Sequence, residues 1–136
     1  MEDLMVRSLV TVAHDATLAA AWRLMRTRQV RHLPVLDAGR RLAGIVTDHD
    51  LRQVILDPAL QEEPGKLASA LDRLRVDEIM TWGVITVEPE TELGAAARIM
   101  HERKLGALVV TAGGFAVGML TATDVIQALV SRAASQ

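Results

Sequence analysis

The chain has 136 residues, of which 50% are apolar and 24% are charged, and its net charge is -2 at pH 7. This composition fits one compact domain or two small halves, and it excludes the basic surface typical of proteins that bind nucleic acid or anionic membranes. Cysteine is absent, which excludes disulfides, thiol nucleophiles and cysteine-based zinc sites. The sequence shows no secretion signal and no apolar run long enough for a membrane span, so we expect a cytoplasmic protein without membrane contact.

The first half of the chain predicts a strand, a helix, two strands and a second helix. The β-branched run at residues 9–12 is typical of a strand. Apolar residues at 18–25 recur with spacings i, i+3, i+4 and i+7, which predicts an amphipathic helix. The apolar runs at 32–37 and 42–46 then predict two strands joined by a loop that contains glycine, and residues 50–56 predict a closing helix.

The next stretch, residues 57–76, reads as a linker. Its beginning is rich in proline and glycine, which indicates turns. Leu67, Leu71 and Leu74 then follow at helical spacing. We therefore predict a short helix within the linker.

The second half repeats the order of the first half. It predicts a strand at 84–87, a helix at 93–100, strands at 107–111 and 116–120, and a helix at 124–130. The sequence itself repeats as well, because many residues of one half meet an identical residue of the other. The chain is therefore an internal repeat.

The alignment of the two halves sets the predicted architecture. Residues 2–36 align on residues 77–111, and after the loss of one loop residue, residues 42–56 align on residues 116–130. An open three-stranded sheet with helices on one face leaves its other face bare. We therefore predict an α/β (α+β) fold in which two pseudo-symmetric β-α-β-β-α repeats pack sheet to sheet. The predicted segments are the first repeat (1–56), the linker with its helix (57–76), the second repeat (77–131) and a C-terminal tail (132–136).

Both repeats contain Thr-x-x-Asp where a strand turns into a helix, in GIVTDHDL (44–51) and GMLTATDV (118–125). A threonine followed three residues later by an acid is the pattern of a helix capping box. The same position also suits a ligand, because free amides at a helix N-terminus attract phosphate and an ionised aspartate accepts hydrogen bonds from ribose hydroxyls. The pattern alone leaves both interpretations open.

The two copies together resemble a tandem pair of CBS domains, the module named after cystathionine β-synthase and also called a Bateman module. The motifs that carry the resemblance are DEIMTWGVITVEPETEL (77–93), VRHLPVLD (30–37), GIVTDHDLRQVIL (44–56) and GMLTATDVIQALV (118–130). The resemblance extends over about residues 2 to 131. It implies a regulatory module that binds adenosine-containing ligands, such as AMP, ADP, ATP, S-adenosylmethionine or an NAD-like molecule, between its repeats. It also implies a homodimer.

Carried over to this chain, the resemblance implies two sites, each built from both repeats. The aspartate would hold the ribose, and the threonine would contact ribose or phosphate. The candidate ligand-binding residues are Val10, Arg31, His32, Pro34, Ile45, Thr47, His49, Asp50, Ile85, Leu105, Gly106, Ala107, Met119, Thr121, Thr123 and Asp124. Val10, Arg31, His32 and Pro34 are assigned to the Asp124 site, and Ile85, Leu105, Gly106 and Ala107 to the Asp50 site.

The residues between threonine and aspartate predict that the two sites are unequal. Asp48 in the first copy would repel a phosphate, whereas Thr123 in the second copy is a neutral hydrogen-bond donor. Arg31 and His32 add positive charge to the site assigned to Asp124. We therefore expect phosphorylated ligands to favour that site, with Mg²⁺ as a possible companion of the phosphates.

Three other functions were considered. Catalysis is disfavoured because no nucleophile elbow, P-loop or HExxH motif is present. Metal binding at Asp48, His49 and Asp50 is disfavoured because consecutive residues at a helix start point in different directions. A dimerisation or protein-interaction module without a ligand remains the main alternative. In either case the module would act on an unidentified regulated protein.

Overall fold

The computed structural model describes residues 9–135, which divide into two compact units. Residues 10–84 form the first unit, and the chain from residue 85 onward forms the second. Residues 1–8, with which the predicted first repeat begins, lie outside the described residues, as does residue 136. Each unit is described by itself.

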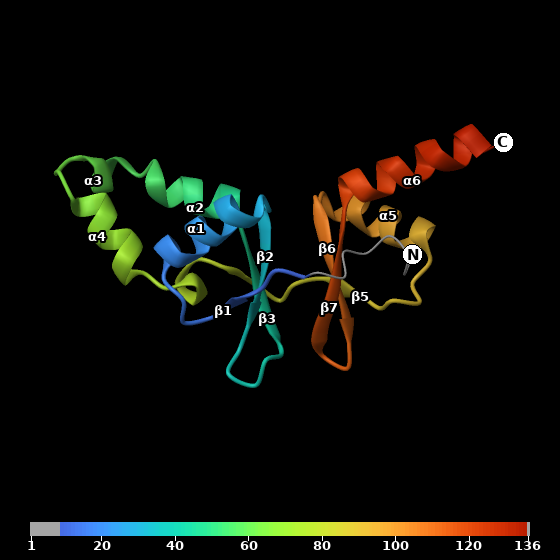
Figure 1. Cartoon of the computed structure of the whole chain (residues 1–136), viewed down its shortest axis with the longest axis horizontal. Coiled ribbons are helices and arrows are strands. Elements are labelled where there is room, and N and C mark those ends of the chain that lie inside the picture. Colours follow the sequence, from blue (N-terminus) through green and yellow to red (C-terminus); the bar gives the residue numbers. More distant parts are fainter. Residues whose placement is uncertain (1–8, 136) are drawn as a thin grey trace. The chain divides into compact units, whose positions relative to one another are not determined.

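The first unit contains a four-stranded sheet in the order β1-β2-β3-β4. The strand β1 runs parallel to β2, and the other neighbours are antiparallel. The helices α1 and α2 cover one face of this sheet (Figure 1). Its elements are β1 (Val12–Ala13), α1 (Leu18–Arg28), β2 (His32–Leu36), β3 (Leu42–Thr47), α2 (Asp48–Ile55), α3 (Pro58–Gln61), α4 (Lys66–Arg73), the 3-10 helix η2 (Val76–Glu78) and β4 (Thr81–Trp82).

The second unit contains a three-stranded sheet in the order β5-β6-β7, with a parallel pair followed by an antiparallel one. The helices α5 and α6 lie on one face of the sheet (Figure 1). Its elements are β5 (Thr86–Val87), α5 (Leu93–Arg103), β6 (Ala107–Ala112), β7 (Phe115–Thr121) and α6 (Ala122–Ser135). The strand-helix-strand-strand-helix order that the sequence predicts is therefore present in both units.

Each unit has its own hydrophobic core between its sheet and its helices. In the first unit Leu18, Leu33 and Leu51 come from a helix, a strand and a helix, and none of them is accessible to solvent. Leu93, Leu108 and Leu120 contribute to the second core. Since burying one leucine side chain contributes about 1.5–3 kcal/mol, these residues stabilise the packing of the helices on the sheets that carry the candidate site residues.

The observed elements differ from the predicted ones mainly at their ends. The first strand of each repeat is shorter than predicted, because only two residues of β1 and two of β5 pair with a neighbouring strand. The helix α6 continues through most of the predicted tail to Ser135, since residues 131–135 contain no glycine or proline to end it. The helix predicted in the linker is α4, and it is preceded by the short helix α3 where the sequence suggested turns.

Candidate functional site

The first Thr-x-x-Asp motif forms a complete capping box. Thr47 has extended backbone angles at the end of β3, and its hydroxyl Oγ1 accepts a hydrogen bond of 3.2 Å from the amide of Asp50. The carboxylate Oδ2 of Asp50 accepts a hydrogen bond of 2.9 Å from the amide of Thr47. The capping interpretation is therefore confirmed for this copy.

The second motif has the same geometry. Oδ2 of Asp124 lies 2.9 Å from the amide of Thr121, and Oγ1 of Thr121 lies 3.2 Å from the amide of Asp124. Within the described part of the chain, neither aspartate has a hydrogen-bond partner for its other oxygen, Oδ1. Capping therefore uses only one of the two carboxylate oxygens, and an ionised carboxylate can accept further hydrogen bonds at the other.

The backbone around both helix starts is also repeated. The amide of Asp48 donates to the carbonyl oxygen of Arg31, and the amide of Ala122 donates to that of Gly106, both at 2.9 Å. Each strand-entry segment follows a residue with left-handed angles, Gln29 at φ 54° or Lys104 at φ 55°. The structure thus places Arg31 and Gly106 beside the helix start of their own repeat.

The sheet register groups further candidate residues. His32 pairs with Thr47 and Pro34 pairs with Ile45, so these four side chains share the sheet face opposite the helices. In the second unit Ala107 pairs with Thr121, and Met119 pairs with Val109 on the corresponding face. Each threonine therefore shares this face with an apolar residue two positions earlier in its strand, Ile45 or Met119, and the binding of a ligand by these residues stays a prediction.

Three apolar candidates pack against the core of their own unit. Val10 contacts the first core, while Ile85 and Leu105 contact the second. They were assigned to the site of the opposite repeat, and that assignment stays a prediction. Their observed contacts show that they also have a structural function.

The residues that differ between the motifs have different surroundings. In the first unit Oδ2 of Asp48 lies 3.7 Å from Nε of Arg52, and the ring of His49 is hydrogen-bonded to Gln53 at 3.1 Å. In the second unit the equivalent residues Ala122 and Thr123 are exposed. The start of α2 therefore carries a negative charge that the start of α6 lacks.

Burial lowers the pKa of the His32 imidazole below its usual value. Asp48 and, to a smaller extent, Asp50 act in the opposite direction, but they do not reverse the shift. His32 is therefore mostly neutral at pH 7 and can serve a ligand as a hydrogen-bonding group. Of the two residues expected to supply positive charge, Arg31 alone does so at neutral pH.

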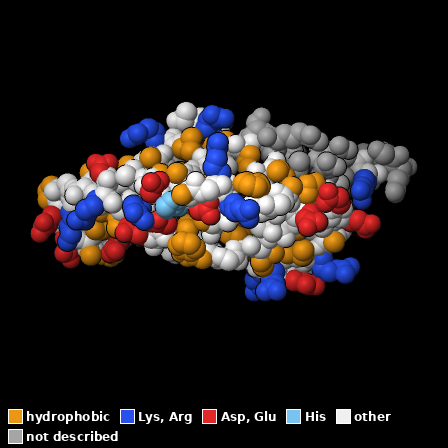
Figure 2. All heavy atoms as spheres, turned by 90° about the horizontal axis from the view of Figure 1, so that it is seen from below, with side chains coloured by type: hydrophobic (Ala, Val, Ile, Leu, Met, Phe, Trp, Pro, Cys, Tyr) orange, Lys and Arg blue, Asp and Glu red, His pale blue; other side chains and the backbone are white. Residues whose placement is uncertain are grey.

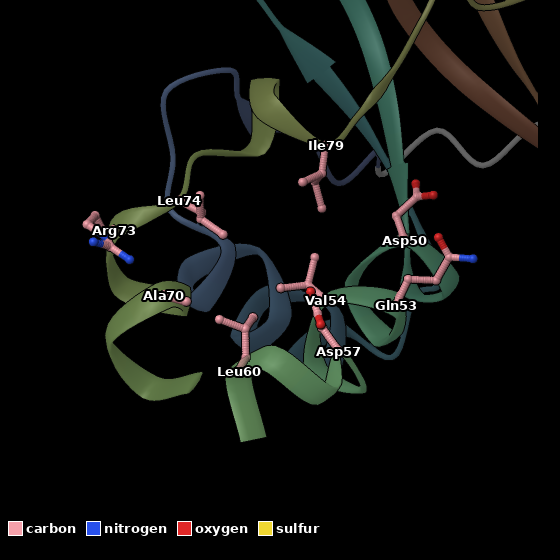
Figure 3. A pocket seen from close by; sticks show the side chains of 9 residues that line it. All are labelled: Asp50, Gln53, Val54, Asp57, Leu60, Ala70, Arg73, Leu74 and Ile79. Carbon is pink, nitrogen blue, oxygen red and sulfur yellow. The ribbon is translucent and has the colours of Figure 1, made fainter. Parts of the chain in front are cut away.

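The first unit also contains a pocket of about 470 Å³ that the sequence did not reveal (Figure 3). We call it the linker pocket, because residues of the linker helices α3 and α4, together with Leu74 after α4 and Ile79 after η2, enclose it against α2. Its apolar wall consists of Val54, Leu60, Ala70, Leu74 and Ile79, and its polar lining consists of Asp50, Gln53, Asp57 and Arg73. The helical spacing of Leu71 and Leu74 predicted one of these helices, but it could not show which face would meet α2.

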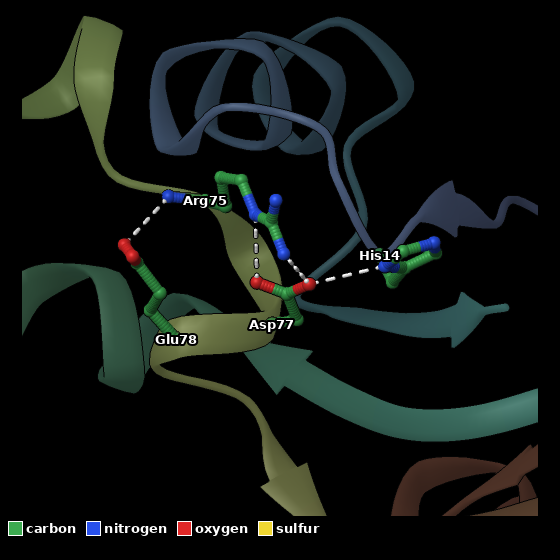
Figure 4. A network of polar contacts seen from close by, with 4 residues as sticks. All are labelled: His14, Arg75, Asp77 and Glu78. Atoms are coloured by element: carbon green, nitrogen blue, oxygen red, sulfur yellow. Dashed lines mark hydrogen bonds and ion pairs between the residues drawn. The ribbon is translucent and has the colours of Figure 1, made fainter.

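A polar network fastens the end of the linker to the first unit (Figure 4). The carboxylate of Asp77 is contacted by Nε of Arg75 at 3.1 Å and by Nδ1 of His14 at 3.0 Å. The amide of Arg75 donates to Oε2 of Glu78 at 3.0 Å. Hydrogen bonds from Arg75 and, second, from His14 lower the pKa of Asp77. The network fixes η2 beside His14, directly before Ile79, which lines the pocket.

Charged side chains of both signs are mixed on the described part of the surface drawn in Figure 2. On the face seen in Figure 2, basic and acidic side chains alternate among apolar ones. Among the described residues, no three histidine or acidic side chains are placed to hold a metal ion. A search of the described helices for one that is long and apolar enough to cross a membrane found none.

Comparison with known proteins identifies both repeats. The family model described as CBS domain matches residues 1–57 and 76–131. A CBS domain-containing protein from Dictyostelium discoideum is 32% identical over 96% of this chain and 90% of its own length. By contrast, an inosine-5'-monophosphate dehydrogenase from Korarchaeum cryptofilum is 36% identical, but the match covers only 23% of that enzyme.

Solved structures show the same fold. The CBS-pair protein CBSX2 from Arabidopsis thaliana has a TM-score of 0.82 and 30% identity, with 97% of this chain and 94% of that chain covered. A structure of CBSX2 in complex with AMP is 31% identical, with a TM-score of 0.79 and coverage of 97% and 96%. The CBS domain pair of protein MJ0100, solved with 5'-methylthioadenosine and S-adenosyl-L-methionine, has a TM-score of 0.77 and covers 96% of this chain and 95% of its own, but at 22% identity it shows the fold alone.

Proposed function

Since the chain belongs to the CBS domain family and contains two copies of the domain, we propose that it is a regulatory module that binds adenosine-containing ligands. The observation that carries this proposal is the pair of aspartates, Asp50 and Asp124. Each holds a helix start with one carboxylate oxygen and has the other oxygen without a partner among the described residues. Vicinal ribose hydroxyls are donors that such an oxygen can accept.

The likeness to a solved CBS pair supports the ligand class. CBSX2, which is 31% identical, has been solved with AMP, and the match covers 96% of that chain and 97% of this one. AMP contains a ribose for the aspartate and a phosphate for a helix N-terminus, where free amides and the helix dipole favour an anion. The helix α6 offers such a terminus without an acidic side chain at its first two positions.

The full set of candidate ligand-binding residues remains a prediction, and so does its division between two sites built from both repeats. The same applies to the predicted boundaries of repeats and linker, to the cytoplasmic location and to a possible Mg²⁺ ion at the phosphates. In this proposal the ligand links the two repeats and changes their relative angle, which a regulated protein detects. A ligand can produce such a change only by binding one arrangement more tightly than the other.

The experiment that tests this function is a thermal-shift and calorimetry screen with AMP, ADP, ATP, S-adenosylmethionine and NAD. A ligand that binds only the folded protein raises the melting temperature, by an amount that depends on its concentration relative to Kd. In the matched double variant Asp50→Asn/Asp124→Asn, each asparagine keeps one side-chain oxygen that can cap its helix. Both negative charges are removed. We expect this variant to lose at least about tenfold in affinity, which corresponds to 1.4 kcal/mol. Undiminished binding by the variant would contradict the ribose assignment.

A second function is favoured by one specific observation on α6. Ile126, Leu129 and Val130 are 60%, 53% and 63% exposed, and their spacing places them on one face of the helix. We propose that this face joins two copies of the chain into a homodimer. If no adenosine compound binds, dimerisation and protein interaction become the preferred function.

The oligomeric state can be measured by analytical ultracentrifugation. Leu129→Glu places a charge in the middle of the apolar face and should convert the dimer into a monomer. Gln127→Glu, at an exposed neighbouring position, provides the control and should leave the dimer intact. A wild-type monomer at high protein concentration would contradict the proposed dimer.

A further inference from the structure

The linker pocket adjoins the predicted ribose-binding carboxylate, because Asp50 belongs to its lining. Its volume of about 470 Å³ lies within the range of small-molecule sites. The whole pocket is formed within the first unit, by α2 on one side and the linker elements on the other. Figure 3 shows that Val54, Leu60, Leu74 and Ile79 project into the space from different sides.

The chemistry of this lining favours an aliphatic group. Five of the nine lining residues are aliphatic, so a compact apolar group that enters the pocket is removed from water. The charged groups of the lining are two carboxylates, Asp50 and Asp57, and one guanidinium, Arg73. Asp50 and Asp57 stand at the two ends of the α2 wall, and their charges oppose the entry of a phosphate.

Both carboxylates are held in place by the backbone. Oδ2 of Asp50 binds the amide of Thr47 at 2.9 Å, and Oδ1 of Asp57 accepts a hydrogen bond of 3.0 Å from the amide of Ala59. Each therefore presents its second oxygen from a fixed position. A positively charged or neutral group between them is electrostatically favoured over an anion.

We propose that the linker pocket receives the 5′ substituent of an adenosine ligand whose ribose is held by Asp50, and that it selects a neutral or cationic aliphatic substituent over phosphate. This inference rests on the proposed function, because it takes Asp50 as the ribose-binding residue. It assigns different ligands to the two repeats. The first repeat takes an adenosine with an aliphatic substituent, whereas the second takes a phosphorylated one.

The test uses calorimetry in an Asp124→Asn background, so that the first site is measured alone. The probes are 5′-methylthioadenosine, S-adenosylmethionine, adenosine and AMP. Leu60→Trp fills the pocket from a half-buried position, and Ala59→Trp places the same side chain on the exposed side of the same short helix. Melting temperatures without ligand establish that both variants fold.

We expect 5′-methylthioadenosine to bind at least tenfold more tightly than AMP in this background. Leu60→Trp should weaken that binding at least tenfold, while Ala59→Trp should leave it unchanged and adenosine should bind both variants about equally. Asp57→Asn keeps the helix cap and removes one charge, so it should weaken S-adenosylmethionine several-fold and leave 5′-methylthioadenosine unchanged.

Two results would overturn the proposal about the pocket. One is tighter binding of AMP than of 5′-methylthioadenosine, and the other is equal binding by Leu60→Trp and Ala59→Trp while Asp50→Asn abolishes binding. A different result would overturn the proposed function itself. If Asp50→Asn changes the binding of no probe, the ribose assignment on which this inference depends is wrong.

Discussion

The starts of α2 and α6 have the same backbone geometry but different chemistry. Their capping hydrogen bonds have equal lengths, 2.9 Å to the carboxylate and 3.2 Å to the hydroxyl. The residues that produce this geometry, threonine and aspartate, are repeated. The residues between them are not, so one helix begins with Asp48 and the other with Ala122.

The surroundings of the two helices differ as well. The linker folds back over α2 and creates a pocket there, whereas α6 presents exposed apolar side chains at Ile126 and Val130. The comparison shows how a duplicated unit can acquire two functions. The repeated residues maintain the fold of both helix starts. In our proposal, the residues that differ determine which ligand fits and which surface meets a partner.

The largest expected effect comes from exchanging the first helix residues, Asp48 and Ala122, because this should change the affinity of each site for a phosphorylated ligand. Asp48→Ala removes a carboxylate from the first site, and Ala122→Asp adds one to the second. Because a charge close to a phosphate changes its energy by 1 kcal/mol or more in a partly screened environment, we expect AMP affinity to rise about fivefold in the first variant and to fall about fivefold in the second. Calorimetry in the matching single-site backgrounds measures both.

The control for this exchange is adenosine, which lacks the phosphate. Its affinity should change less than twofold in either variant, which corresponds to a change in binding free energy below about 0.4 kcal/mol. Equal changes for AMP and adenosine would mean that Asp48 acts through the structure of the site and not through charge.

Removal of the two caps should destabilise the repeats to a similar extent. Thr47→Ala and Thr121→Ala each delete one equivalent hydrogen bond, and loss of such an N-cap costs about 1 kcal/mol. Urea unfolding measures the loss. Thr→Ser at the same positions keeps the hydroxyl and serves as the control, since it should retain most of the stability.

A large difference between Thr47→Ala and Thr121→Ala would contradict structural equivalence of the two helix starts. Ligand binding adds a separate readout. If threonine also contacts the ligand, each alanine variant should weaken AMP beyond the effect of its stability loss.

The half-buried His32 should make the stability of the first repeat depend on pH, whereas its equivalent in the second repeat, Ala107, does not titrate. Its pKa is lowered by burial, so the unfolded chain binds the proton more readily than the folded protein. Stability is therefore full above the unfolded pKa of 6.5 and falls as the pH drops below it. His32→Gln should lose less stability than the wild type between about pH 7.5 and pH 5.

Urea unfolding of both proteins at several pH values tests this sign. The other histidines are common to wild type and variant, so the difference between the two curves isolates His32. A wild type that gains stability relative to His32→Gln as the pH falls would show that the neighbouring acids dominate over burial.

The linker network should give the smallest effect. The pKa of Asp77 is lowered by hydrogen bonds from Arg75 and His14, so its contribution is full above the unfolded pKa of 3.8 and disappears as the pH falls through the lower folded pKa. Asp77→Asn should be less stable than the wild type near neutral pH, and the difference should shrink in acid. Glu88→Gln, at an exposed carboxylate of the second unit, provides the control.

The elements and the capping boxes could be predicted because they depend on local patterns. The spacing of Leu18 and its apolar neighbours predicted α1, and Thr-x-x-Asp predicted both caps. The internal repeat added the expectation of one small sheet in each copy, and the first unit adds a fourth strand, β4, to that sheet.

The linker pocket and the charge state of His32 could not be predicted, because they depend on how distant segments pack. Leu60 and Leu74 read as helix residues in the sequence, and only the fold of the linker brings them to Val54. Likewise, burial of His32 results from the packing around β2, and the sequence does not reveal it.

The central claim is that the two repeats provide similar but unequal adenosine sites, with phosphate preferred at Asp124. Calorimetry of AMP and adenosine with Asp50→Asn and Asp124→Asn tests it most directly. The account predicts that Asp124→Asn removes most AMP binding, whereas Asp50→Asn retains a site that binds AMP more tightly than adenosine. Equal loss of AMP affinity in both variants, or stronger AMP binding at the Asp50 site, would contradict it.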